Sequence, residues 1–166
     1  MTIPFMVALV AHDLEAAAAE AGATVPVDLP EDLVDFLQYR LGQLAVDPSI
    51  RPWLGRLMVL TTEDGVRQVI GTIGFHGPPD DLGRAEIGYR VSADQRRRGF
   101  ARESVQAMFD WAHREHGVTR FLASVSPLNV ASLALTAGFG FRQIGEQMDP
   151  IDGLELIFET TWPRPA

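Results

Sequence analysis

Apolar residues recur at helical spacing in the first third of the chain. A stretch opened by Pro30 places leucines three or four positions apart, which predicts an amphipathic helix. These leucines are Leu33, Leu37, Leu41 and Leu44. An alanine-rich stretch before it, with Asp13 as its N-cap and Gly22 at its end, predicts another helix. Two helices are therefore expected before the first strand.

The middle of the chain changes to the alternation typical of strands. Leu57–Thr61 and Val66–Phe75 flank the turn sequence Glu63-Asp64-Gly65, which predicts a β-hairpin. From Arg84 to Val91, apolar residues alternate with residues that are ionisable or glycine. This strand is therefore expected to bury one face and to carry its ionisable groups on the other.

Helices and strands alternate in the rest of the chain. A helix is predicted from about Gly99 to His116, with a buried stripe made of Val105, Met108, Phe109 and Ala112. The elements expected after it are a strand over Arg120–Val125, a short helix over Asn129–Ala137, and an antiparallel pair over Phe141–Met148 and Leu154–Thr160. The order α-α-β-β-β-α-β-α-β-β indicates a mixed α/β (α+β) domain around one largely antiparallel sheet.

The composition is that of an ordinary single domain. The chain has 166 residues, of which 46% are hydrophobic and 22% charged. All 14 basic residues are arginine, and the chain contains no cysteine. The missing side chains exclude a disulfide framework, a cysteine zinc site, a thiolate nucleophile, a Schiff-base lysine and a Walker lysine.

Charge is distributed unevenly along the chain. The net charge is −8, yet residues 90–102 carry five arginines against one aspartate, whereas residues 1–39 carry seven acids and no arginine. This balance argues against a protein that coats nucleic acid or an anionic membrane, and favours a focused site for a small anion. The first arginine is Arg40 and no apolar run approaches 18 residues, so we expect neither a signal peptide nor a membrane span, and a cytoplasmic protein.

The most basic segment, residues 95–101, falls where a strand is expected to end and a helix to begin. Helix N-termini present unpaired backbone N–H groups and a partial positive charge, so they are suited to binding anions. Gly99 and Ala101 leave little bulk beside that backbone. The alternative is that the arginines belong to an ordinary solvated turn.

Three blocks of sequence occur in order over residues 85–89, 96–101 and 129–141. Together they resemble the GNAT N-acetyltransferase superfamily, in the branch of the ribosomal-protein N-terminal acetyltransferases. Arg96-x-x-Gly99-x-Ala101 resembles the Gln/Arg-x-x-Gly-x-Gly/Ala signature of that superfamily. Ala85-Glu86-Ile87-Gly88-Tyr89 resembles the strand before the signature. Asn129-x-x-Ser132, followed by Gly140-Phe141, resembles the helix and turn after it. The blocks cover about residues 70–148.

The resemblance implies acetyl-CoA as acetyl donor, bound at the splayed centre of the sheet. The pyrophosphate would lie on the backbone N–H groups of six residues, namely Arg96, Arg97, Arg98, Gly99, Phe100 and Ala101. Arg90 and Val91 would pair with the pantetheine arm, and Asn129 would bind the far side of the cofactor with Ser132 nearby. The alternatives to cofactor binding are an N-cap role for Asn129 and an ordinary position in the first turn of the helix for Ser132.

The resemblance also implies how the chain is organised as one acyl-CoA N-acyltransferase domain. A helical part on the acceptor side is expected over residues 1–55, the cofactor-binding core over 56–148, and a closing strand and tail over 149–166.

Glu86 is the candidate catalytic base, because it lies on the ionisable face of its strand and matches an acidic position of many relatives. The alternative is an exposed glutamate paired with a neighbouring arginine. At Thr136 many relatives carry a tyrosine that protonates the leaving thiolate, so the acid is unassigned. His76 is a candidate for binding substrate or shuttling a proton, with polar surface as its alternative. Asp152 is a candidate for binding a cationic substrate, with a turn as its alternative.

The predicted activity is direct transfer of an acetyl group from acetyl-CoA to a primary amine in a ternary complex. A catalytically silent acyl-CoA-binding or regulatory module is the alternative, and a nucleic-acid-binding role is disfavoured by the acidic total. The acceptor can be a small-molecule amine or a protein N-terminus. The sequence also leaves open whether the acyl group is acetyl or longer. The sequence is compatible with a homodimer. No metal is expected, because His113 and His116 have no third ligand in register.

Overall fold

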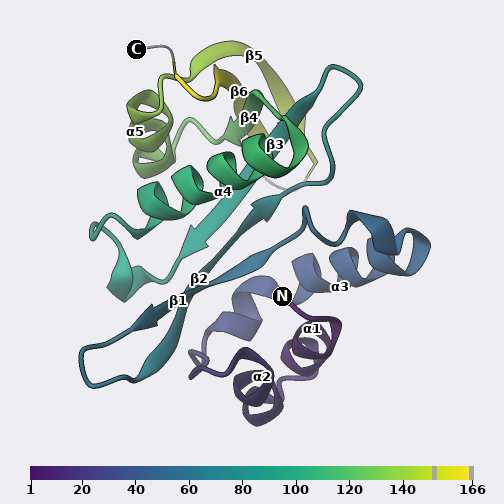
Figure 1. The fold of residues 1–166 in the computed structure, drawn as a ribbon, viewed down its shortest axis with the longest axis vertical. Helices are drawn as coiled ribbons and strands as arrows, with labels where there is room; N and C mark the ends of the chain where they lie inside the picture. The colour runs from purple at the N-terminus through teal and green to yellow at the C-terminus, as the bar shows by residue number, and fades with distance from the viewer. Residues whose placement is uncertain (151–152, 165–166) are drawn as a thin grey trace. The chain divides into compact units, whose positions relative to one another are not determined.

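The computed structural model describes residues 1–150 and 153–164 of the chain. Its α-helices are α1 (Ile3–Val10), α2 (Leu14–Ala21), α3 (Leu29–Val46), α4 (Phe100–His116) and α5 (Val130–Gly138) (Figure 1). Its strands are β1 (Arg56–Thr61), β2 (Arg67–Phe75), β3 (Arg84–Val91), β4 (Arg120–Val125), β5 (Arg142–Asp149) and β6 (Gly153–Thr161). Short 3-10 helices lie at Pro48–Ile50 and Ala93–Gln95.

The strands form one open, mixed sheet in the order β1-β2-β3-β4-β6-β5. The pairs β1–β2, β4–β6 and β5–β6 are antiparallel, whereas β3 and β4 are parallel. The registered pairs of β3 and β4 begin at Arg84 with Arg120 and end at Glu86 with Leu122, although both strands continue. The predicted fold class is confirmed, and this short ladder marks the centre of the sheet.

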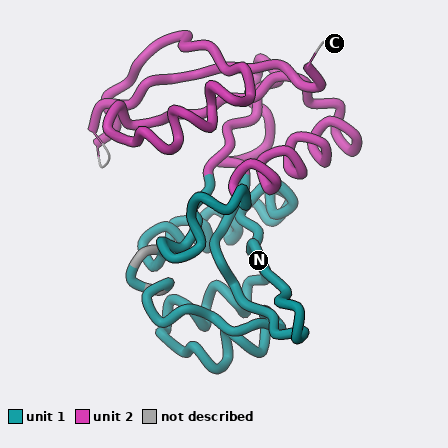
Figure 2. Tube along the Cα trace, turned by 90° about the vertical axis from the view of Figure 1, so that its left-hand side faces the viewer, with its two compact units in different colours: residues 1–74, 89–100 teal, residues 75–88, 101–166 magenta. Residues whose placement is uncertain are grey.

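The chain divides into two compact units. Unit 1 contains Met1–Gly74 and Tyr89–Phe100, and unit 2 contains Phe75–Gly88 and Ala101–Ala166 (Figure 2). Strands β2 and β3 each contribute residues to both units.

Unit 1 has a core of helices packed beside β1 and β2 (Figure 1). The predicted caps of α2 are confirmed, since Asp13 accepts a hydrogen bond from the Ala16 N–H at 3.0 Å and Gly22 ends the helix with a left-handed φ of 58°. The predicted leucine stripe of α3 is buried at Leu33, Leu37 and Leu44. These residues form the apolar centre of unit 1 together with residues of the other two helices.

The expectation of two helices before the first strand is wrong, because α1 precedes them. Ile3–Val10 reads IPFMVALV and offers no polar positions from which a helical period could be recognised. The Thr2 hydroxyl accepts the Phe5 N–H at 3.1 Å and so caps the helix. Phe5 and Leu9 are almost completely buried, so packing rather than amphipathic pattern decides this element.

Unit 2 is organised around Phe109 of α4. Its ring stacks on Phe121 of β4 with 4.0 Å between centroids, which holds α4 against that strand. Trp162 packs on the same ring, and its indole N–H donates to Asp110 of α4 at 2.8 Å. The four residues predicted to form the buried stripe of α4 are all buried, and the predicted antiparallel pair near the end of the chain is confirmed as β5 and β6.

Two glycines of unit 1 provide a matched test of this packing. A Cβ on Gly71 of β2 would lie 2.2 Å from the Arg90 carbonyl oxygen, whereas a Cβ on Gly42 of α3 would meet nothing within 4 Å. We expect Gly71→Ala to destabilise the protein by about 2 kcal/mol or more, because a backbone atom must move. Gly42→Ala should stabilise it by about 0.5 to 1 kcal/mol, because alanine favours the helix. Urea unfolding of both variants checks this, and a neutral Gly71→Ala would contradict the β2–β3 packing.

Candidate functional site

The segment from Gln95 to Ala101, here called the arginine loop, connects β3 to α4. Arg97 and Gly99 have positive φ values of 61° and 88°, and they flank Arg98. Alternation of left-handed and right-handed backbone lets successive N–H groups converge on an anion. The first turn of α4 adds N–H groups that have no acceptor within the helix. The loop therefore has the backbone form of an anion site.

The arginine side chains of the loop have different roles. Arg96 donates its Nε–H to the Val91 carbonyl at 3.0 Å and so fastens the loop to the end of β3. Arg98 donates to the side-chain oxygen of Gln95 at 2.5 Å and lies 5.0 Å over the ring of Phe100. Arg97 is exposed. The loop is thus held by its own side chains while its charges face solvent.

A small pocket in unit 1 adjoins the end of β3. Its lining residues come from the N-terminal end of α3, from β2, from the end of β3 and from the segment after it, and they are Asp28, Leu29, Gly71, Thr72, Arg90, Ser92, Ala93 and Arg96. Two residues predicted to bind the cofactor, Arg90 and Arg96, therefore meet at one pocket. Val91, also predicted, is buried, and its carbonyl accepts the Arg96 bond described above.

A separate group of candidate residues lies in unit 2, where His76, Glu86 and Ser124 form what we call the Glu86 cluster. The Ser124 hydroxyl donates to Glu86 Oε1 at 2.6 Å, and His76 Nδ1 lies 3.5 Å from Glu86 Oε2. The two carboxylate oxygens thus have different partners. His76 is half exposed (52% of its side chain), whereas Glu86 is only 28% exposed.

Three strands place this cluster. The backbone N–H of His76, just after β2, donates to the Glu86 carbonyl on β3 at 2.9 Å. Glu86 pairs with Leu122 in the last registered position of β3 and β4, and Ser124 follows two residues later on β4. Side chains two residues apart share one face of a strand. This arrangement brings Glu86 next to His76, 10 residues earlier in the sequence, and next to Ser124, 38 residues later.

The environment of Glu86 favours its ionised form. Burial raises the pKa of the carboxyl group, but the hydrogen bond and positive charge of His76 and the hydrogen bonds from Ser124 lower it by more. The pKa of Glu86 therefore lies below its ordinary value. A carboxylate of low pKa is a good anchor for a hydrogen-bond donor and a weak base.

The imidazole of His76 lies over Gly88. A Cβ on Gly88 would be 2.9 Å from His76 Nε2, so a larger residue would push the ring away. Glu86 and Gly88 share one face of β3, while Ala85 and Ile87 on the other face are buried. The ring therefore lies along β3 with one nitrogen toward Glu86 and the other over the glycine.

The remaining predicted site residues lie in or beside α5 and α4, or outside the described residues. The Asn129 side chain accepts the Ser132 N–H at 3.0 Å, so the N-cap role is realised. Thr136 is buried and donates its hydroxyl to the Leu133 carbonyl at 2.9 Å, which leaves it unsuited to replace a tyrosine acid. Ala101 belongs to the first turn of α4. The prediction for Asp152 lies outside the described residues.

Sequence reasoning missed Ser124 and Gly88. Ser124 occupies a partly exposed position between buried residues of β4. This pattern indicates the exposed face of the strand, but it does not indicate which residue Ser124 contacts.

Within residues 1–150 and 153–164, no group of three or more His, Asp or Glu side chains is arranged to hold a metal ion. No helix among these residues is long and apolar enough to cross a membrane.

Known proteins resemble this chain in sequence and in fold. The profile of the acetyltransferase (GNAT) domain matches residues 9–142. An uncharacterised N-acetyltransferase of Bacillus licheniformis, p20, is 33% identical over 103 residues, which cover 62% of this chain and 57% of that protein. A second, YoaA of Bacillus subtilis, is 37% identical over 79 residues, which cover 48% of this chain and 45% of that protein.

Among solved structures, the ribosomal-protein-S5-alanine acetyltransferase of Vibrio fischeri has a TM-score of 0.61 at 17% identity, covering 99% of this chain and 94% of that one. This likeness shows the fold. Because the domain profile spans most of the sequence, the chain belongs to the GNAT acetyltransferase family. The match spans about half the length of the curated relatives.

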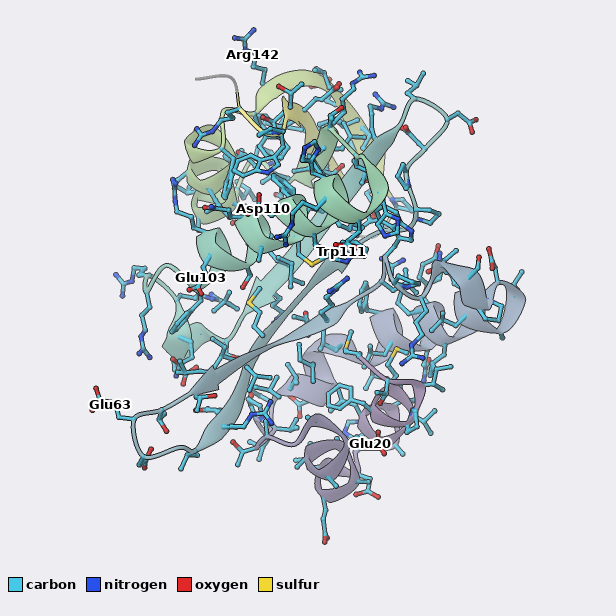
Figure 3. The ribbon with its side chains drawn as sticks, in the orientation of Figure 1. Glu20, Glu63, Glu103, Asp110, Trp111 and Arg142 are labelled. Carbon is cyan, nitrogen blue, oxygen red and sulfur yellow. The ribbon has the colours of Figure 1, made fainter. Side chains whose placement is uncertain are left out.

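The pH dependence of folding tests the Glu86 cluster. Since the folded pKa of Glu86 is depressed, its carboxylate stabilises the fold above its ordinary pKa of 4.5, and this stabilisation is lost as the pH falls through the folded value. Glu86→Gln should therefore cost on the order of 1 kcal/mol at pH 7 and progressively less below about pH 4.5. Glu63→Gln, at an exposed turn (Figure 3), is the control. A cost for Glu86→Gln that is equal at pH 3.5 and pH 7 would contradict the carboxylate contacts.

Proposed function

We propose that this protein is an acetyl-CoA-dependent N-acetyltransferase that acylates a primary amine. The observation that carries the proposal is the arginine loop, with left-handed backbone at Arg97 and Gly99 immediately before α4. Family membership supports acyl transfer as the reaction class. The cosubstrate would supply the activated acetyl thioester.

The loop suits the phosphates of coenzyme A. A pyrophosphate needs several N–H donors and positive charge, which the backbone at the start of α4 and three exposed arginines offer. A Cβ on Gly99 would meet nothing within 4 Å, so the backbone there is open to a ligand. The microcin C7 self-immunity acetyltransferase MccE was solved in complex with acetyl-CoA and AMP, and it shares this fold at 14% identity with a TM-score of 0.59, covering 96% of this chain and 88% of that one.

The Glu86 cluster suits the proton chemistry of amine acylation. An alkylamine has a pKa near 10, so only about one molecule in a thousand is unprotonated at neutral pH, a handicap of roughly 4 kcal/mol. A proton acceptor beside the acceptor amine offsets this cost. With no cysteine in the chain, transfer proceeds by direct attack rather than through an enzyme thioester.

A silent acyl-CoA-binding module is the second candidate, and the buried hydroxyl of Thr136 favours it, because the position offers no acid for the leaving thiolate. Thiol release separates the two. The protein is incubated with acetyl-CoA and a panel of polyamines, amino-sugar amines and peptides with free N-termini. Release above the acceptor-free rate supports the enzyme, and binding of acetyl-CoA without release supports the module.

Substitution of Gly99 tests the phosphate site. We expect Gly99→Glu to weaken acetyl-CoA binding at least about hundredfold, because it places a carboxylate among the N–H donors and strains the left-handed backbone. Gly117→Glu at the other end of α4 is the matched control, since Gly117 also has a positive φ of 68° and open space around it. Calorimetric titration measures both variants. Equal affinity in Gly99→Glu and the parent would refute the site.

Truncation of Arg97 separates side-chain charge from backbone donors. Arg97→Ala is expected to weaken acetyl-CoA binding by only about three- to tenfold, and to reduce the dependence of affinity on salt, because an exposed charge is screened. The dissociation constant is measured at 50 and 500 mM NaCl for the variant and the parent. A loss as large as that of Gly99→Glu would assign the site to the side chain instead.

A further inference from the structure

The two ring nitrogens of His76 have different surroundings. Nδ1 lies 3.5 Å from Glu86 Oε2, and Nε2 lies over Gly88, where a Cβ would come within 2.9 Å of it. The backbone bond from His76 to the Glu86 carbonyl fixes the register that brings them together. About half of the histidine side chain (52%) is exposed.

This arrangement determines which nitrogen carries a proton when the ring is neutral. Neutral imidazole has one N–H donor and one acceptor nitrogen. An ionised carboxylate only accepts hydrogen bonds, so the nitrogen facing Glu86 must be the donor. The lone pair is then on Nε2, on the side of the ring away from the carboxylate.

Glu86 itself is poorly suited to take a proton from a substrate. Oε1 accepts the Ser124 hydroxyl at 2.6 Å, and Oε2 faces His76. Its pKa lies below the ordinary value because these partners stabilise the ionised form more than burial opposes it. It is also less exposed than His76, 28% against 52%.

We propose that Nε2 of His76 is the proton acceptor in amine acylation, and that Glu86, held by Ser124, is the positioning residue that keeps the proton on Nδ1. The inference rests on the function proposed above. In the step, a bond forms between the acceptor nitrogen and the acetyl carbonyl carbon, and the carbon–sulfur bond breaks. The nitrogen's proton passes to Nε2, the sulfur leaves as the CoA thiolate, and the imidazolium can return the proton to it.

The tautomer of His76 tests the pairing without any substrate. Long-range proton–nitrogen NMR correlations on 15N-labelled protein at pH 8 distinguish the two neutral tautomers. His76 is assigned with His76→Asn, and His12, His113 and His116 serve as internal references. We expect the Nδ1–H form to predominate for His76 in the parent and to lose its majority in Glu86→Gln. A majority of the Nε2–H form in the parent overturns the proposal.

Kinetics then test the division of roles. With the best acceptor of the amine panel, His76→Asn should lower kcat by about 100-fold or more with little change in the acceptor KM, and should remove the acidic limb of the pH–rate profile. Glu86→Gln should lower kcat less and keep that limb, because the imidazole is still present. The reverse order, with the limb lost only in Glu86→Gln, would make Glu86 the direct base and overturn the proposal.

Two further variants keep both His76 and Glu86, so they test the proposal without removing either ionisable group. Gly88→Ala leaves both ionisable groups in place but displaces the ring, so we expect about a tenfold loss of kcat. Ser124→Ala removes one anchor of the carboxylate and should shift the His76 tautomer ratio in the direction of Glu86→Gln. Full activity and an unchanged tautomer in both variants would contradict the proposal. If the parent protein releases no thiol with any amine, the proposed N-acetyltransferase function is wrong. The tautomer measurement still tests the contact between His76 and Glu86 in that case.

Discussion

The register of β3 is the constraint on which the Glu86 cluster depends. Ala85 and Ile87 are buried on one face of the strand, so Glu86 and Gly88 must lie on the other. A slip of one residue would bury the carboxylate and expose the apolar side chains, which is why the register is strongly specified. The parallel ladder with β4 ends at Glu86, close enough in register for Ser124 to reach the carboxylate.

The same alternation explains why much of the fold was predictable. Strands β3 and β4 have the predicted bounds, because their apolar residues recur at a period of two beside obvious turns. The α4 stripe was predictable for the corresponding reason at helical period. Helix α1 was not, because Ile3–Val10 is apolar almost throughout and only its contacts with the other helices distinguish it from a buried strand.

The candidate site was only partly predictable, because local features can be recognised in a sequence and partnerships cannot. The arginine loop can be recognised in the sequence from its three consecutive arginines. Its Gly99 has the positive φ that glycine readily adopts. Glu86 stood out by its strand position. The link to Ser124 depends on parallel pairing across 38 residues, and that to His76 on the register between β2 and β3. Neither register can be read from one strand alone.

The pairing of His76 with Glu86 bears on the missing acid. Relatives resembled by this sequence often carry a tyrosine at the position of Thr136, whose hydroxyl here is buried and committed to the Leu133 carbonyl. A base that takes a proton during attack becomes an acid for the next step. Glutamate of depressed pKa would hold such a proton poorly, whereas the imidazolium formed in the proposed step can pass its proton to the leaving thiolate. One histidine in the proposed role therefore supplies both the proton acceptor for the amine and the proton donor that Thr136 does not provide.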